Sequence, residues 1–388
     1  MERDGKTGSN RQLWPVLAGY FIMAFSDLVA PITPRIAASL PAGMQAWASF
    51  LPTTVFLWFL LLSVPVAVLM NRIGRRRTAL LGDALAALGL LTAYFAGGEG
   101  LAGYFAGFGL LGIGCTAIQV SVNPMLAMLA PRDRMSVYLT LGQVFRNTAL
   151  LLLAPVVTLL VWLAGSWELL LPLYALLTVA GGLWMAFTRF DDPAMNAPSA
   201  ERVDLKGYLG LMKNGTVALC ALSIGAFLML DVGIGYLSVQ LVDSPNPLLT
   251  TTFFYACRIA GSLAGVWILS RVDDLKYLCG CMAVAALVCV SLFSQHAAWV
   301  VYAGLGLLGF VLACVFATFF AAATRAVPER ANEVSGLMIL MISAGALSAP
   351  VIGAIVRHSG DVRSGVWFLL LCVLFIGGAA CYLKKRKG

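Results

Sequence analysis

Among the ionisable residues that lie inside long apolar stretches of the sequence, four carry most of the information: Asp27, Arg146, Asp231 and Arg258. A charged side chain in hydrocarbon costs about 2.5–3.5 kcal/mol on the insertion scale, so such residues normally face a cavity or a partner. A carboxylate there can take up a proton, and a guanidinium can hold an anionic group in its planar fork. Opposite charges can also simply pair and position helices. These four residues mark where chemistry within a membrane is expected.

Asp27 is the first candidate for proton coupling, because it lies close to the middle of the first apolar stretch and hydrocarbon favours a neutral carboxyl group. The alternative is a permanent ion pair with Arg146. Asp231 occupies roughly the matching position in the second half of the chain. It is a candidate for a second proton-coupling group, or it pairs with Arg258, and the sequence slightly favours the pair. Tyr236 and Gln240 continue the face of Asp231 and are expected to contact a substrate.

Arg146 is the main candidate for substrate binding, since arginine remains charged when buried. Gln143 lies one turn earlier on the same helical face. Gln119 and Asn123 share a face of another span, and their amides can donate to and accept from sugar hydroxyls. The alternatives are a structural salt bridge for Arg146 and interhelical hydrogen bonds for the amides. One mechanism follows: a proton on Asp27 releases Arg146 to bind an anionic substrate.

Composition predicts the setting of these residues. Of 388 residues, 60% are hydrophobic and 11% are charged, and the mean hydropathy is +0.89. A soluble domain carries about 25% charged residues. The composition therefore argues against a soluble enzyme or a nucleic-acid-binding protein, and the net charge of +8 is interpreted as a topology signal.

Twelve apolar stretches of spanning length predict an all-α membrane protein with twelve transmembrane helices. They lie at about 13–38, 46–70, 78–97, 101–129, 137–164, 167–188, 215–242, 248–270, 275–294, 297–325, 333–356 and 365–383. Of the 26 Lys and Arg residues, only Arg35, Arg357 and Arg363 fall in the loops of one side, and Arg146 and Arg258 fall within spans. Positive loops stay in the cytoplasm, so both termini are expected there, in a bacterial inner membrane.

The predicted spans fall into two halves. A polar linker over 189–214, whose Asp204–Lys213 part is typical of an interfacial helix, separates a six-helix bundle over 1–188 from a second over 215–388. Short motifs recur between the halves: Leu110-Leu-Gly112 matches Leu307-Leu-Gly309, and Ala154-Pro155 matches Ala349-Pro350. A repeat with an even number of helices is a parallel repeat, the arrangement of major-facilitator transporters.

The segment Asn71-Arg72-Ile73-Gly74-Arg75-Arg76-Arg77 resembles the major-facilitator loop motif Gly-x-x-x-Asp-Arg-x-Gly-Arg-Arg. Ala67 stands at the glycine position and Asn71 at the aspartate position. In that family the aspartate helps to latch the halves in the outward-facing state, and the resemblance implies a weaker latch here. It assigns to conformational change the residues Asn71, Arg72, Gly74 and Arg75, joined by Asp83 and Arg258. Asp83 is expected to pair with an arginine of this loop.

A narrower resemblance is to the L-fucose permease family of fucose–galactose–glucose proton symporters. It rests on Ser26-Asp27-Leu-Val-Ala-Pro31, Gly114-Cys-Thr-Ala-Ile-Gln119-Val-Ser-Val-Asn123-Pro124, Leu139-Thr-Leu-Gly-Gln143-Val-Phe145-Arg146, Arg258-Ile-Ala-Gly-Ser262 and Ser335-Gly-Leu-Met…Gly345-Ala…Pro350. The resemblance implies that Asp27 carries the proton. Gln119 replaces the family's glutamate and Arg146 replaces its asparagine, so one titratable group is missing and a cation is added.

These observations predict a secondary active transporter that moves a sugar or an acidic sugar derivative together with protons by alternating access. The alternative is a proton-antiport exporter of drugs or metabolites. An enzyme is not expected, because His296 and His358 fall in predicted outer loops and no nucleophile–base pair is evident. No cofactor, metal ion or nucleic acid is expected. The expected partners are a small-molecule solute, protons and the lipid bilayer, with the chain acting as a monomer.

Overall fold

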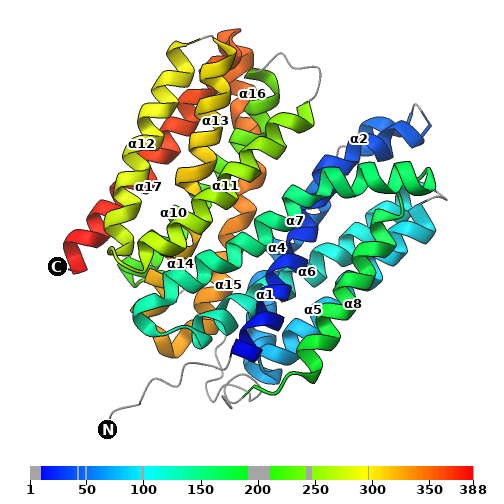
Figure 1. Cartoon of the computed structure of the whole chain (residues 1–388), viewed down its shortest axis with the longest axis horizontal. Helices are drawn as coiled ribbons and strands as arrows, with labels where there is room; N and C mark the ends of the chain where they lie inside the picture. The colour runs from blue at the N-terminus through cyan, green and yellow to red at the C-terminus, as the bar shows by residue number, and fades with distance from the viewer. Residues whose placement is uncertain are drawn as a thin grey trace. The chain divides into compact units, whose positions relative to one another are not determined.

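The structure is a computed structural model that describes residues 10–41, 43–48, 50–97, 100–190, 210–241, 247–295 and 297–387. Every regular element among these residues is a helix (Figure 1). Twelve helical stretches are long and apolar enough to cross a membrane, and they begin and end within a few residues of the predicted spans. The predicted all-α membrane fold is confirmed.

The helices follow the apolar runs because a helix satisfies its backbone hydrogen bonds within one segment, as hydrocarbon demands. The α-helices in chain order are α1 (Asn10–Met23), α2 (Val29–Ser39), α3 (Gln45–Ala48), α4 (Leu51–Ile73), α5 (Arg75–Gly97), α6 (Leu101–Leu129), α7 (Met135–Ala164), α8 (Leu170–Phe187), α10 (Gly215–Leu241), α11 (Pro247–Leu269), α12 (Asp274–Ser294), α13 (Ala298–Leu312), α14 (Val315–Ala326), α15 (Ala331–Ile342), α16 (Ser348–Ser359) and α17 (Gly365–Lys387). The 3-10 turns are η1 (Ala24–Leu28), η2 (Arg132–Arg134), η4 (Pro328–Arg330), η5 (Ser343–Leu347) and η6 (Val362–Ser364).

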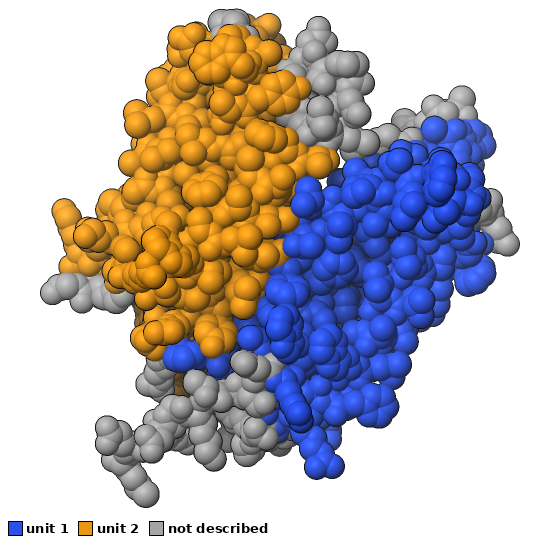
Figure 2. All heavy atoms as spheres, viewed as in Figure 1, with its two compact units in different colours: residues 1–131, 145–208, 330–340 blue, residues 132–144, 209–329, 341–388 orange. Residues whose placement is uncertain are grey.

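Residue contacts divide the chain into two compact units (Figure 2). Unit 1 comprises residues 1–131, 145–208 and 330–340, and unit 2 comprises 132–144, 209–329 and 341–388. Each unit therefore includes a short segment from the other half of the chain: most of α15 in unit 1 and the start of α7 in unit 2. The boundary predicted at 189–214 stays a prediction, and its interfacial helix lies largely outside the described residues.

The helices α5 and α6 of unit 1 pack backbone against backbone. A Cβ atom added at Gly89 would lie 2.4 Å from the backbone nitrogen of Leu111, and one at Gly114 would lie 2.4 Å from the backbone nitrogen of Ala86. Small residues permit such close approach, which is a main source of helix association in membranes. The other side of α5 packs on α8. These contacts hold the helices that carry Gln119, Asn123 and Asp83.

Two spans are interrupted by short 3-10 turns. In the first span, η1 separates α1 from α2, and in the eleventh, η5 separates α15 from α16. A 3-10 stretch within a helix often marks a hinge or a functional site. Asp27 lies in η1, where its neighbours Phe25, Ser26 and Leu28 are buried.

Candidate functional site

Asp27 and Arg146 form an ion pair within unit 1. Nη2 of Arg146 on α7 donates to Oδ2 of Asp27 at 2.6 Å. The two side chains are 15% and 17% exposed, so the pair is mostly withdrawn from solvent but not sealed. Ser26 Oγ lies 3.5 Å from the other carboxylate oxygen of Asp27. The structure thus brings together the carboxylate of Asp27 and the guanidinium of Arg146, as one of the sequence-based alternatives predicted. A proton on Asp27 would weaken this ion pair.

Tyr20 connects α1 to α6. Its hydroxyl donates to Oδ1 of Asn123 at 2.7 Å. Nδ2 of Asn123 donates in turn to the carbonyl oxygen of Gln119 at 2.6 Å. Both ends of the Asn123 amide are therefore used inside the unit. Sequence reasoning missed Tyr20, because an aromatic residue in an apolar span usually packs without a polar role.

The two predicted glutamines differ from Asn123. Gln119 is 1% exposed and Gln143 is 5% exposed, and Nε2 of each has no hydrogen-bond acceptor among the described residues. A buried amide donor without an acceptor is costly. Each of these side chains therefore has a donor available for a polar ligand. Gln119 lies in unit 1, and Gln143 lies on the part of α7 that belongs to unit 2.

Unit 2 contains the second predicted pair. Arg258 on α11 donates to Asp231 on α10. The Arg258 guanidinium also lies over the rings of Phe227 and Phe254, at 5.4 and 5.7 Å from their centroids. The guanidinium of Arg258 therefore forms cation–π contacts with two aromatic rings in addition to its ion pair. Tyr236 and Gln240, further along α10, are exposed, and their contact with a substrate stays a prediction.

The loop motif lies in a buried polar network of unit 1. Gly74 has a φ of 90°, a left-handed conformation that ends α4 and that favours glycine. Nδ2 of Asn71 donates to Glu333 at 2.8 Å, and Nε of Arg75 donates to Asn332 at 2.6 Å. Asn332 also donates to Asn71. Arg72, in contrast, is exposed.

Sequence reasoning missed the partners of this network. Glu333 and Asn332 lie more than half the chain away from the loop, and the motif that begins at the nearby Ser335 did not indicate either partner. Ser335 adds a hydrogen bond to the carbonyl oxygen of Val120 on α6, at 2.7 Å. The start of α15 is therefore held in unit 1 by polar contacts with α4, α5 and α6.

A comparable network, also missed, lies in unit 2. Asp274, the first residue of α12, accepts a hydrogen bond from Ser136 at 2.7 Å and an ion pair from Arg325 at the end of α14. Ser136 belongs to the short segment of α7 that lies in this unit. Each unit thus binds the segment it receives from the other half of the chain through a buried acid: Glu333 in unit 1 and Asp274 in unit 2.

Asp83 on α5 does not form the expected pair with a loop arginine. It is 4% exposed, and neither of its carboxylate oxygens has a hydrogen-bond donor among the described residues. Arg76 instead donates to the carbonyl oxygens of Met185 and Ala186 at the end of α8 and stacks on Phe190. Those carbonyls lack partners within α8, so they compete successfully for the guanidinium.

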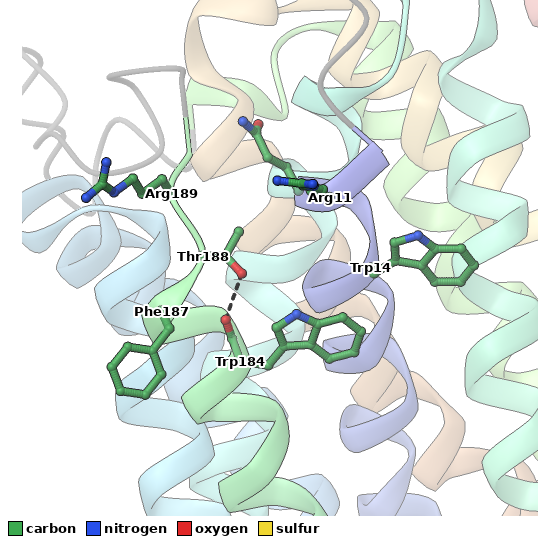
Figure 3. A pocket seen from close by; sticks show the side chains of 7 residues that line it. Arg11, Trp14, Trp184, Phe187, Thr188 and Arg189 are labelled. Carbon is green, nitrogen blue, oxygen red and sulfur yellow. Dashed lines mark hydrogen bonds between the residues drawn. The ribbon is translucent and has the colours of Figure 1, made fainter.

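Two cavities open near the ends of the unit 1 helices. One of about 580 Å³ lies between the start of α1 and the end of α8 and is lined by Arg11, Gln12, Trp14, Trp184, Phe187, Thr188 and Arg189 (Figure 3). Half-exposed Trp14 and Trp184 are typical of the membrane–water interface. The other, of about 990 Å³, is lined in part by Trp47, Tyr104 and Glu168. Neither cavity is lined by Asp27 or Arg146. We therefore take as the candidate site the buried polar side chains around this ion pair: Asp27, Arg146, Tyr20, Gln119 and Asn123.

Comparison with known proteins identifies the class. The family model of the Major Facilitator Superfamily matches residues 16–350, so the chain belongs to this superfamily of transporters. The fold is similar to that of the fucose:proton symporter FucP of E. coli, with 17% identity, a TM-score of 0.82 and coverage of 95% of this chain and 98% of that one. A structure of FucP in the outward conformation is similar at 16% identity, a TM-score of 0.83 and the same coverage.

The fold is also similar to that of a bacterial homologue of the iron transporter ferroportin in an outward-facing state. The two chains are 15% identical, the TM-score is 0.76, and the match covers 97% of this chain and 100% of the other. No curated protein sequence matches the chain. Identities at this level establish the fold alone. The described residues contain no group of three or more His, Cys, Asp or Glu side chains that could hold a metal ion.

Proposed function

We propose that this protein is a proton-coupled symporter of an acidic sugar derivative in a bacterial inner membrane, with both termini in the cytoplasm. The observation that carries the proposal is the 2.6 Å pair between Asp27 and Arg146 at the 3-10 interruption of the first span. The similarity in fold to a fucose:proton symporter supports a sugar as the solute class. Arg146 supports an anionic member of that class, since a neutral hexose needs no guanidinium.

The pair couples proton to solute through charge balance. In the empty carrier the Asp27 carboxylate neutralises Arg146. A proton on Asp27 removes the carboxylate charge, and the guanidinium then binds the carboxylate of the substrate, for which its planar fork offers two parallel donors. The sum of these charges is zero in both states, so neither state places an uncompensated charge in hydrocarbon. Substrate anion and proton therefore cross together.

The neighbouring amides supply contacts for hydroxyl groups. Gln119 offers a buried donor in the same unit as Arg146, and Gln143 offers another one turn before Arg146 on α7. Asn123, whose amide is already bonded to Tyr20 and to the Gln119 carbonyl, positions α6 against α1. The Asp231–Arg258 pair, whose guanidinium also lies over two aromatic rings, stabilises the packing of unit 2.

The test is proton entry into proteoliposomes that contain a pH-sensitive dye. D-glucuronate and N-acetylneuraminate are added outside under an inward proton gradient, and L-fucose and D-galactose serve as neutral comparisons. Acidification with the acids only, abolished in Arg146→Ala, is the expected result. A response to neutral sugars alone would assign Arg146 to structure. No response to either set, with correctly folded protein, would favour proton-antiport export and overturn the import proposal.

A further inference from the structure

Two cysteine side chains of unit 2, which the proposed function does not use, are in contact on neighbouring helices. The thiol of Cys381 on α17 donates to Sγ of Cys279 on α12, with the two sulfur atoms 3.0 Å apart. Cys381 is exposed and Cys279 is half-buried. Of the other seven cysteines, six are buried and Cys257 is half-buried. This pair therefore combines direct contact between two thiols with access from the surface of the protein.

The packing of α12 on α17 holds the two thiols together (Figure 1). One turn away from them, a Cβ atom added at Gly377 would lie 3.1 Å from Cβ of Met282. Met282 is three residues after Cys279. Gly377 is four residues before Cys381, so both contacts follow one antiparallel register of the two helices. A disulfide requires Cβ atoms about 3.5–4.5 Å apart, and backbones that approach this closely permit that separation.

Basic residues follow the thiols toward the ends of both helices. Lys276 lies one turn before Cys279, Lys384 lies one turn after Cys381, and both lysines are exposed. A lysine near the end of a span extends its ammonium group to the headgroup level. The thiols therefore lie about one helical turn, or about 5 Å, from the polar interface, where a small polar oxidant reaches them.

The proposed topology places this interface in the cytoplasm. Glutathione and thioredoxin keep cytoplasmic thiols reduced, and disulfides formed there are transient. A bond between these two cysteines would therefore form only when an oxidant is present, and it would be reversed afterwards.

We propose that Cys279 and Cys381 are a redox modification site, which hydrogen peroxide oxidises to a disulfide between α12 and α17. The thiolate of the exposed Cys381 attacks peroxide, the O–O bond breaks, and Cys381 becomes a sulfenic acid while the released hydroxide takes up a proton to form water. The thiol of Cys279 then attacks the sulfenic sulfur, and its proton leaves with the hydroxyl group as a second water. Two thiols thus lose two electrons and two protons, and one peroxide is reduced to two waters. A dithiol reductant reverses the bond by thiol–disulfide exchange.

The bond stabilises unit 2. The two cysteines are 102 residues apart in the chain, and a cross-link that closes a long loop restricts the unfolded state. Both helices belong to unit 2, so the bond adds no covalent link to unit 1. The expected consequence is a unit 2 that resists unfolding under oxidising conditions, whatever solute the protein transports.

Peptide mapping of the purified, reduced full chain tests whether the bond forms. After treatment with hydrogen peroxide, the remaining thiols are blocked with N-ethylmaleimide and the digest is analysed by mass spectrometry. The expected product is a linked peptide of Cys279 and Cys381, lower in mass by two hydrogen atoms than its two parts and lost after dithiothreitol. A wild-type chain that keeps a sulfenic acid on Cys381 without a linked peptide, or that links either cysteine to a different one, would overturn the proposal.

Two variants check the order of the steps. Cys279→Ser should retain a sulfenic acid on Cys381, which reacts with dimedone, because the second thiol is missing. Cys281→Ser changes the buried cysteine two residues away and should form the bond as the wild type does. Loss of the bond in Cys281→Ser, or absence of the sulfenic acid in Cys279→Ser, would contradict the assigned roles.

Two further measurements test the redox role. Peroxide should raise the melting temperature of the wild type in detergent by several degrees and leave that of Cys381→Ser unchanged; no shift in the wild type, or an equal shift in both, would refute the stabilisation. Peptide mapping of membranes from cells before and after exposure to peroxide should detect free thiols before and the linked peptide after. Free thiols in both samples, or the linked peptide in both, would overturn a site that responds to peroxide.

Discussion

Replacing Asp27 with asparagine removes the group that competes with substrate for Arg146. The contact at 2.6 Å is a charge-assisted hydrogen bond between side chains that are 15% and 17% exposed. Hydrogen bonds to charged groups contribute about 1.5–3 kcal/mol. At 1.4 kcal/mol per factor of ten, the competition weakens binding of an anionic substrate by about 10- to 150-fold wherever Asp27 is ionised.

The sign of the pH dependence follows from the same competition. In the wild type, affinity for D-glucuronate is high where Asp27 is protonated and falls as the pH rises and the carboxylate rebinds Arg146. In Asp27→Asn, affinity is high and independent of pH, and it exceeds the wild-type value at alkaline pH by the factor above. Titration calorimetry on purified protein across a pH series measures both curves.

A matched control is Asp231→Asn, which removes the acid of the other buried pair and leaves Arg146 untouched. Its affinity should follow the wild-type pH profile. If Asp27→Asn kept the wild-type pH dependence, or bound the anion more weakly than the wild type at alkaline pH, the reasoning from competition would be refuted.

Three further changes test the packing around the site. Asn71→Asp restores the aspartate of the family motif but places its carboxylate next to that of the buried Glu333, in place of a hydrogen bond of 2.8 Å. A cysteine introduced at the fully buried Ser335 should then react with maleimide about tenfold faster or more, and an unchanged rate would show that the Asn71–Glu333 contact does not hold the start of α15. Arg258→Lys keeps the charge but loses the planar stacking on two rings, and thermal unfolding in detergent should reveal a loss of about 1–2 kcal/mol; equal melting temperatures would show that the stacking contributes nothing. Gly89→Ala brings a Cβ to 2.4 Å from a backbone nitrogen and should cost about 1–3 kcal/mol, whereas Gly280→Ala, with no atom within 4 Å of its Cβ, should be neutral; equal losses would remove the close packing as the cause.

The spans and the Asp27–Arg146 contact were predictable for one reason. In hydrocarbon few polar groups are tolerated, so the apolar runs define the helices and the rare charges must find one another. Asp231 and Arg258 follow the same rule. The contacts of Arg258 with two aromatic rings were not predictable, because Phe227 and Phe254 resemble any other apolar residue of a span.

The polar networks at the helix ends could not be predicted from the sequence, for a different reason. Polar residues near loops have many candidate partners, including water, so the pattern alone does not select Glu333 for Asn71 or Arg325 for Asp274. For Asp83 the sequence predicted a partner that the structure does not show. Its position near a basic loop favoured an ion pair with a loop arginine, whereas Arg76 donates to the carbonyl oxygens at the end of α8 instead.

The close contact of α5 and α6 also bears on how the chain assembles. The two helices are consecutive, separated only by residues 98–100, so the contact requires closure of a very short loop. It can form as soon as both helices have entered the bilayer during synthesis, before α7 and α8 exist. The hairpin made of α5 and α6 then offers a preformed surface on which α8 docks, and this docking buries Asp83. The buried environment of Asp83 is therefore completed late in biogenesis, when the last helix of the first half joins.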